Sequence, residues 1–169
     1  MRSLRRALTA AALGVVIASC GGGDGAVDPG DRLPEVDITA LDGGATISLS
    51  EIDGPAVINL WATWCAPCRR EIPDFEAVHV ARGSEIQIIG VNIGEDADDA
   101  AAFLTDVGAT YDQYLDSTGL VVTALETSTM PVTLVIDRNA RLSTRHLGPM
   151  DENDLNAAID EALSTPDDG

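Results

Sequence analysis

The chain contains no lysine, and all ten of its positively charged side chains are arginines. Acidic residues far outnumber them, because the 28 Asp and Glu give a formal net charge of −18. Nucleic acids and anionic lipid surfaces attract basic patches, so this charge argues against both as ligands of the domain surface. The simpler interpretation is that the acidic charge keeps an exported protein soluble.

Aromatic residues are also scarce, at 4%, whereas apolar residues as a whole make up an ordinary 45% of the sequence. A hydrophobic core must therefore be built mainly from Ala, Val, Ile and Leu. With 169 residues the chain has the length of one domain, since domains typically hold on the order of 100 to 200 residues.

The first twenty residues differ in character from the rest of the chain. Three arginines precede a small, apolar stretch at residues 7–18, which is too short for a stable transmembrane helix and is typical of a secretory signal peptide. The segment from Ile17 to Cys20 resembles a bacterial lipobox, although Ile17 stands where Leu is commoner. We therefore expect residues 1–19 to be a lipoprotein signal peptide; an ordinary signal peptide or a single N-terminal anchor is the alternative.

The sequence has three cysteines, and an odd cysteine in an exported protein requires an explanation. Lipidation of Cys20 would supply it and would anchor the protein outside the cytoplasm to the bacterial cell membrane, with residues 20–30 as a flexible tether. Only Cys65 and Cys68 then remain. Because a domain of this size can fold on its core alone, this pair is free to be chemical rather than structural.

Hydrophobic patterning predicts one α/β domain over residues 31–165, followed by a polar tail at 166–169. The expected elements are, in order, a hairpin within Leu33–Leu49, a buried strand at 56–62, a helix at 65–82, a buried strand at 86–93, a helix at 96–107, a short helix at 118–125, a buried strand at 132–136, a return strand at 141–147 and a helix at 152–163. This order predicts a central mixed sheet flanked by helices. It resembles a thioredoxin fold with an N-terminal β-hairpin extension and an inserted helix before Pro131.

Cys65 and Cys68 form a C-x-x-C motif between a predicted buried strand and a predicted helix, a context typical of redox motifs. At a helix N-terminus, unpaired backbone N–H groups and the helix dipole both favour a thiolate, which is the attacking species in disulfide exchange. We therefore expect Cys65 to be the nucleophile. Cys68, one turn into the helix, is shielded and can resolve a mixed disulfide. Pro67 fits the first helical turn, where its missing N–H is no loss.

The C-x-x-C motif has three other interpretations: a zinc site, a peroxide-reducing site, and a copper chaperone or non-catalytic scaffold. Zinc binding needs two further ligands, and the only histidines, His79 and His146, have a simpler interpretation as surface residues. Peroxide reduction requires a threonine placed beside the reactive cysteine, and Thr63 is not so placed. A copper chaperone or a non-catalytic scaffold is the third alternative. The chaperone would retain stoichiometric metal after purification, whereas a dithiol enzyme needs no cofactor beyond its two sulfur atoms.

The run Asn59–Pro73, which reads NLWATWCAPCRREIP, closely resembles the thioredoxin-like, membrane-anchored TlpA-like family. That family includes the extracytoplasmic reductases of cytochrome c maturation. The resemblance extends over about residues 31–163. It implies a thioredoxin fold in which Cys65 is the nucleophile and Cys68 the resolving cysteine.

The same resemblance assigns roles to residues around the cysteines. It implies a cis peptide bond before Pro131, where a trans proline that opens a strand is the simpler alternative. The backbone of Met130 would then pair with the extended chain of a substrate. We expect Trp64 to form a flat, partly exposed wall beside the site, with a position in the core as the alternative.

One departure from thioredoxins concerns their buried acid, which is replaced here by Asn59, a side chain that cannot move protons as a carboxylate does. Glu71 is the expected substitute, because it lies three residues after Cys68 on the same helical face and TlpA-like proteins place an acid there beneath the cysteines. Burial beside the thiols should raise its pKa. The alternative is a surface Glu71 that pairs with Arg69 or Arg70.

Together these features predict a thiol–disulfide oxidoreductase that acts on extracytoplasmic protein substrates and exchanges electrons with a membrane redox partner. A reductase in cytochrome c maturation is the first hypothesis. An oxidant or isomerase in the folding of exported proteins is the second, because the sequence does not set the redox potential. We expect a monomer that binds neither nucleic acid nor metal.

Overall fold

The computed structural model describes residues 27–166, so the predicted signal peptide, Cys20 and the last three residues lie outside the described residues. In chain order its elements are β1 (Asp37–Ala40), β2 (Thr46–Ser48), the 3-10 helix η1 (Leu49–Glu51), β3 (Ala56–Trp61), α1 (Ala66–Arg82), β4 (Gln87–Ile93), α2 (Ala97–Val107), β5 (Asp112–Asp116), α3 (Leu120–Ala124), β6 (Val132–Ile136), β7 (Leu142–Leu147) and α4 (Glu152–Ser164).

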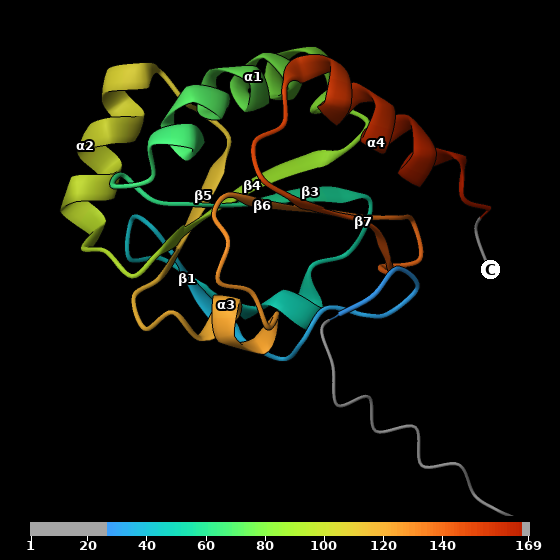
Figure 1. Ribbon diagram of the computed structural model, residues 1–169, viewed down its shortest axis with the longest axis horizontal. Coiled ribbons are helices and arrows are strands. Elements are labelled where there is room, and N and C mark those ends of the chain that lie inside the picture. The colour runs from blue at the N-terminus through green and yellow to red at the C-terminus, as the bar shows by residue number, and fades with distance from the viewer. Residues whose placement is uncertain (1–26, 167–169) are drawn as a thin grey trace, which may run out of the picture.

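The seven strands of residues 27–166 form a single mixed sheet in the order β2-β1-β5-β4-β3-β6-β7. Strands β3, β4 and β5 are parallel, and the remaining pairings are antiparallel. Helices α1, α2 and α4 cover one face of the sheet, and α3 lies on the other (Figure 1). The predicted thioredoxin fold, its hairpin extension and its inserted helix are therefore confirmed.

Strand β3 lies near the middle of the sheet, and all six of its residues are buried because both faces are covered. Successive side chains of a strand point to opposite faces. Val57 and Trp61 accordingly pack under the helices α1, α2 and α4, whereas Ile58 packs on the face that carries α3. The same alternation places Asn59 beneath α1, on the face where the cysteines lie.

Helix α1 buries one face against the sheet, at the spacing expected of an amphipathic helix. Its buried residues are Cys68, Glu71, Ile72, Phe75 and Val78. One carboxylate is thus included in a face that is otherwise apolar or sulfur-bearing. The fold itself brings Glu71 to the interior, one turn after Cys68.

Strand β5 was not predicted from the sequence, which suggested no element between residues 107 and 118. Its sequence begins and ends with aspartate and lacks an apolar alternation. It forms because β4 and β1 supply hydrogen-bonding partners on its two sides. Residues 27–166 include no helix that is both long and apolar enough to span a membrane.

Candidate active site

Cys65 lies between the end of β3 and the first residue of α1. Cys65 is the residue that caps this helix, with an extended backbone (φ −86°, ψ 98°), and its Sγ accepts a hydrogen bond from the backbone N–H of Cys68 at 3.3 Å. A disulfide joins the two residues, whose Cα atoms are 5.3 Å apart. Cys65 retains 5% exposure and Cys68 has none, so an incoming sulfur atom reaches Cys65 first.

The two tryptophans near the disulfide lie in opposite environments. Trp64 is 64% exposed, so the alternative that it lies in the core is wrong. Trp61 is fully buried with the cysteines and packs on Phe103 of α2, with ring centroids 5.6 Å apart. The guanidinium of Arg69 lies 5.1 Å from the same Phe103 ring. This stack joins α1 to α2 beside the active site.

The predicted cis peptide bond between Met130 and Pro131 is confirmed. Met130 is half-buried and packs against the hydrophobic cluster that contains both cysteines. The carbonyl of Pro131 accepts a hydrogen bond from the backbone N–H of Gly148 at 2.9 Å, which joins this loop to the end of β7. A second cis peptide bond precedes Pro55 and was not predicted.

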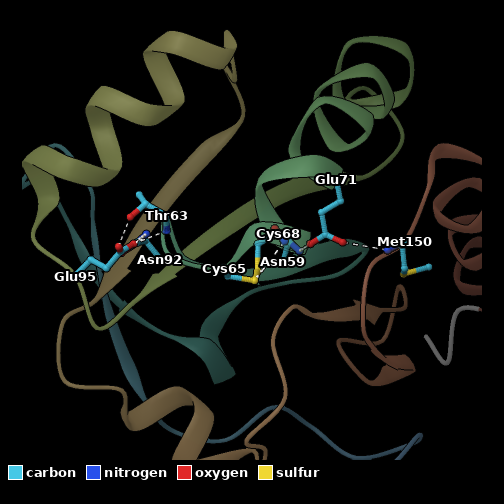
Figure 2. The surroundings of a disulfide bond; sticks show 8 residues. All are labelled: Asn59, Thr63, Cys65, Cys68, Glu71, Asn92, Glu95 and Met150. Carbon is cyan, nitrogen blue, oxygen red and sulfur yellow. Dashed lines mark hydrogen bonds between the residues drawn. A yellow bond between two sulfur atoms is a disulfide. The ribbon is translucent and has the colours of Figure 1, made fainter.

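Glu71 is only 2% exposed, so the prediction that it is buried is confirmed and the surface alternative is wrong. Its Oε1 accepts a hydrogen bond from the side-chain amide of Asn59 at 2.8 Å, and its Oε2 accepts one from the backbone N–H of Met150 at 3.0 Å. Figure 2 shows the carboxylate between Asn59 on β3 and Met150 just before α4. Within residues 27–166 Arg82 is the only positively charged residue in an ion pair, and its partners are Glu85 and Asp160. Glu71 therefore pairs with neither Arg69 nor Arg70.

The electrostatic environment of Glu71 favours its protonated form. Burial raises the pKa of this carboxyl to about 7, the hydrogen bonds from Asn59 and Met150 offset part of the rise, and the charge of Asp74 adds to it. A carboxyl with this pKa can both accept and release a proton near neutral pH. Its position one turn after Cys68 places both side chains on the buried face of α1.

A groove of about 250 Å³ lies between α1 and the start of α4. Its lining residues are Pro67, Arg70, Glu71, Asp74, Pro149, Met150, Asp151 and Asp154. Pro67 belongs to the C-x-x-C motif itself. The groove therefore connects the surface beside the motif with the buried carboxyl of Glu71.

A second carboxylate at the site, Glu95, was not predicted as a functional residue. It accepts hydrogen bonds from the backbone N–H of Thr63 at 2.7 Å, from the hydroxyl of Thr63, and from the side-chain amide of Asn92 at 2.7 Å. These bonds tie the loop that carries Trp64 and Cys65 to the end of β4 (Figure 2). The Thr63 hydroxyl is thus engaged by Glu95 and does not serve a peroxide-reducing cysteine.

The sequence did contain a signal for Glu95. It lies two residues after the end of the buried strand β4, and the carboxyl ends of parallel strands meet at one edge of a sheet, where functional side chains gather. The acidic residues that follow Glu95 suit the first turn of α2. The sequence therefore predicts the start of a helix in this acidic segment and does not single out Glu95.

The histidines considered as zinc ligands lie in other settings. His79, on α1, has its ring 6.1 Å from that of Tyr111. His146, on β7, has its Nε2 3.3 Å from the carbonyl oxygen of Pro149. In the part of the chain that the structure describes, neither is grouped with the cysteines as a metal site.

Comparison with known proteins places these features in a family. The model of the AhpC/TSA family matches residues 29–145. The thiol-disulfide oxidoreductase ResA of Geobacillus kaustophilus is 30% identical over 132 residues, which cover 77% of this chain and 75% of that protein. The thiol:disulfide interchange protein HelX of Rhodobacter capsulatus is 31% identical over 138 residues, 80% of this chain and 77% of that protein. A solved structure of a secreted thiol-disulfide isomerase from Corynebacterium glutamicum is similar, with a TM-score of 0.66, 28% identity, and coverage of 78% of this chain and 83% of the other.

Proposed function

The chain belongs to the AhpC/TSA family, and on that premise we propose that its Cys65–Cys68 pair exchanges electrons with the thiols and disulfides of extracytoplasmic proteins. The chain is a thiol–disulfide oxidoreductase, the activity named for its Geobacillus relative. The observation that carries the proposal is a C-x-x-C disulfide at the start of α1 with the buried carboxyl of Glu71 one turn beyond it. No cofactor is required, because the two sulfur atoms hold the electron pair.

In the reducing direction, the Cys65 thiolate attacks one sulfur of a substrate disulfide. A new S–S bond forms between Cys65 and that sulfur, the substrate S–S bond breaks, and the second substrate sulfur leaves as a thiolate that takes up a proton. The capping position of Cys65 favours its thiolate, because the backbone N–H of Cys68 points at its sulfur.

The second step uses the buried half of the site. Cys68 gives its proton to the Glu71 carboxylate, and the resulting thiolate attacks the Sγ of Cys65. The Cys65–Cys68 bond forms, the mixed disulfide breaks, and the first substrate sulfur leaves as a thiolate. The substrate has then gained two electrons, and the protein has returned to its disulfide form with Glu71 protonated.

The surroundings of the disulfide hold the substrate for these steps. The backbone of Met130, before the cis Pro131, pairs with an extended substrate segment, and Trp64 and Pro67 contact the same segment from the side of the motif. The exposure of Trp64 and the packing of Met130 beside the cysteines support this assignment.

The direction of electron flow defines two candidate functions. A reductase in cytochrome c maturation is the first, because residues 59–73 resemble that branch of the TlpA-like family. An isomerase or oxidant for exported proteins is the second, favoured by the likeness to a secreted isomerase. The redox potential of the Cys65–Cys68 pair separates them: a value near about −270 mV indicates a reductase, and one near about −120 mV an oxidant.

We further propose that residues 1–19 are removed and that Cys20 is lipidated, which tethers the domain to the outer side of the cell membrane. The short Gly-rich sequence between Cys20 and the first described residues supports a tether. Incorporation of labelled fatty acid into the wild type and its absence from Cys20→Ser would support this; labelling of both proteins alike would contradict it.

Insulin-disulfide reduction tests the mechanism, with Cys20→Ser as the matched control that replaces the one cysteine outside the C-x-x-C motif. Cys65→Ser should lose at least about 1,000-fold in rate, because the remaining thiol of the motif, Cys68, is fully buried, whereas the control should keep the wild-type rate. Cys68→Ser should accumulate the mixed disulfide, visible by mass spectrometry. Full activity in Cys65→Ser would show that another group carries the reaction.

A further inference from the structure

Three exposed apolar side chains stand on segments at one edge of the sheet. Within residues 27–166 four large apolar side chains are well exposed, and three of them, Trp64, Leu120 and Leu147, stand on segments that meet at the edge where β3, β4, β5 and β7 end. Leu147 pairs with Val132, directly after the cis proline. Trp64 directly precedes Cys65, so at least one exposed apolar side chain lies beside the reactive disulfide.

Carboxylates flank this apolar group on both sides. Helices α2 and α4 begin at the same edge, one on each side of the C-x-x-C helix α1 (Figure 1). The exposed acids in and around their first turns are Asp96, Asp98 and Asp99 on α2, and Asp151, Glu152 and Asp154 on α4. Asp151 caps α4 through hydrogen bonds from two backbone N–H groups, but no hydrogen bond or ion pair among the described residues involves the other five carboxylates.

Basic side chains near this edge do not balance the acids. Arg69 and Arg70, on the first turns of α1, are the arginines closest in sequence to the cysteines. The guanidinium of Arg69 lies over the ring of Phe103, and Arg70 shares its groove with Asp74 and other acids. The edge around the disulfide is therefore apolar at its centre and negatively charged on two sides.

We propose that this edge docks substrate segments that are apolar around the reacting cysteine and carry basic side chains on both sides of it. The inference rests on the proposed function and names its substrate class. Unpaired carboxylates on the approach to a site attract cationic partners, raise their association rate and repel anionic ones. The apolar side chains then bury against the substrate at the centre, where desolvation favours contact.

Acids in the first turn of a helix also stabilise that helix through its dipole, so loss of activity alone would not separate the two roles. The ratio of rates for cationic and anionic substrates does separate them, because a purely structural role affects both substrates equally. Each variant should therefore be tested as a ratio, on the full-length protein.

Three short disulfide-bonded peptides with the same apolar centre and flanking Arg, Gln or Glu residues provide the probes. At low salt the reduced protein should react at least about tenfold faster with the Arg peptide than with the Glu peptide, and the ratio should fall towards one at about 0.5 M salt. The double variants Glu152→Gln with Asp154→Asn, and Asp98→Asn with Asp99→Asn, should each lower the ratio about threefold.

The matched control is the double variant Asp53→Asn with Glu161→Gln, which removes two exposed acids away from this edge and should leave the ratio unchanged. Leu147→Ser should slow all three peptides alike. Equal reaction of the wild type with the three peptides, or a ratio lowered as much by the control as by the edge variants, would overturn the docking proposal alone. Failure to reduce any of the peptides would overturn the proposed function together with it.

Discussion

Two carboxylates, Glu71 and Glu95, flank the disulfide, and they differ in what surrounds them. Glu71 lies on the buried face of α1, is 2% exposed, and accepts two hydrogen bonds, from the side-chain amide of Asn59 and from the backbone N–H of Met150. Glu95 is half-buried after β4 and accepts three, two from Thr63 and one from a buried asparagine. The first lies on the side of the resolving cysteine, and the second holds the loop of the nucleophile.

The comparison shows how environment divides one residue type into two tasks. Burial raises the pKa of Glu71 to about 7, which makes its carboxyl a group that exchanges protons near neutral pH. Glu95 instead collects three donors on one carboxylate, and charge-assisted bonds of this kind are strong and directional. We therefore assign Glu71 to chemistry and Glu95 to the position of the loop.

The largest expected effect is on the pH dependence of stability. Between the ordinary pKa of 4.5 and the folded value of about 7, the unfolded chain releases the Glu71 proton while the folded protein keeps it. The contribution of Glu71 to stability is therefore greatest below pH 4.5 and is lost as the pH rises to about 7, a loss of about 3 kcal/mol from this group. Urea unfolding of the wild type and Glu71→Gln at pH 4.5 and pH 8 measures the difference.

Glu71→Gln is a suitable partner for that comparison, because Asn59 can turn its unpaired Oδ1 towards the new amide. The variant should lack the decline in stability that Glu71 causes. An identical pH dependence in both proteins would mean that Glu71 is ionised in the folded state throughout this range.

The next effect is on catalysis. Glu71→Gln should slow the resolution step by about 100-fold, because a positioned acid–base group contributes about 10² to 10⁴ in rate. The loss should be largest near neutral pH and shrink at high pH, where Cys68 releases its proton to solvent. Stopped-flow decay of the mixed disulfide isolates this step, and Glu161→Gln, a distant exposed glutamate, is the control. A uniform loss across pH would indicate a structural effect only.

Glu95→Ala should destabilise the protein by about 2 kcal/mol, because the side-chain amide of the fully buried Asn92 loses its partner. Denaturant unfolding of the variant and of the wild type measures the loss. Unchanged stability would show that the hydrogen bonds of Glu95 do not hold the loop of the nucleophile, and it would remove the distinction between the two carboxylates.

The smallest effect is expected for Thr63→Val, which removes one of the three donors to Glu95 and keeps the backbone N–H bond. We expect a loss of about 1 kcal/mol in stability, the ordinary value of one hydrogen bond. Hydrogen exchange of the backbone amide of residue 63 should be faster in the variant, whereas exchange of the Met150 amide, which donates to Glu71, should not change. Faster exchange in both places would mean that the two sides of the site are not independent.

The difference between the two carboxylates also explains what the sequence could predict. Cys65, Cys68 and Glu71 lie within seven residues at one strand–helix junction, so helical spacing alone places them together. The contact between Glu95 and Thr63 joins residues 32 apart and depends on β4 pairing with β3. The two predicted strands indicate that their carboxyl ends share one edge of the sheet, but the local pattern does not reveal which side chains meet there.

Strand β5 illustrates the same limit. Its polar sequence gives no strand signal, and its conformation comes from β1 and β4, which hold it on both sides. The Met150 amide was equally hidden, because a backbone N–H carries no residue signature. It reaches Glu71 only once β7 and α4 have folded over α1. Burial of Glu71 could thus be predicted from helical spacing together with the resemblance to TlpA-like proteins, but its hydrogen-bonding partner across the fold could not.

Direct titration of the Glu71 carboxyl carbon by NMR in the oxidised protein, assigned by the signal that disappears in Glu71→Gln, is the sharpest test of its assigned role. A midpoint near pH 7 is predicted, because burial outweighs the two N–H bonds that the carboxylate accepts. A midpoint near the ordinary value of 4.5 would contradict it, since a carboxylate ionised throughout could not hold the proton of Cys68.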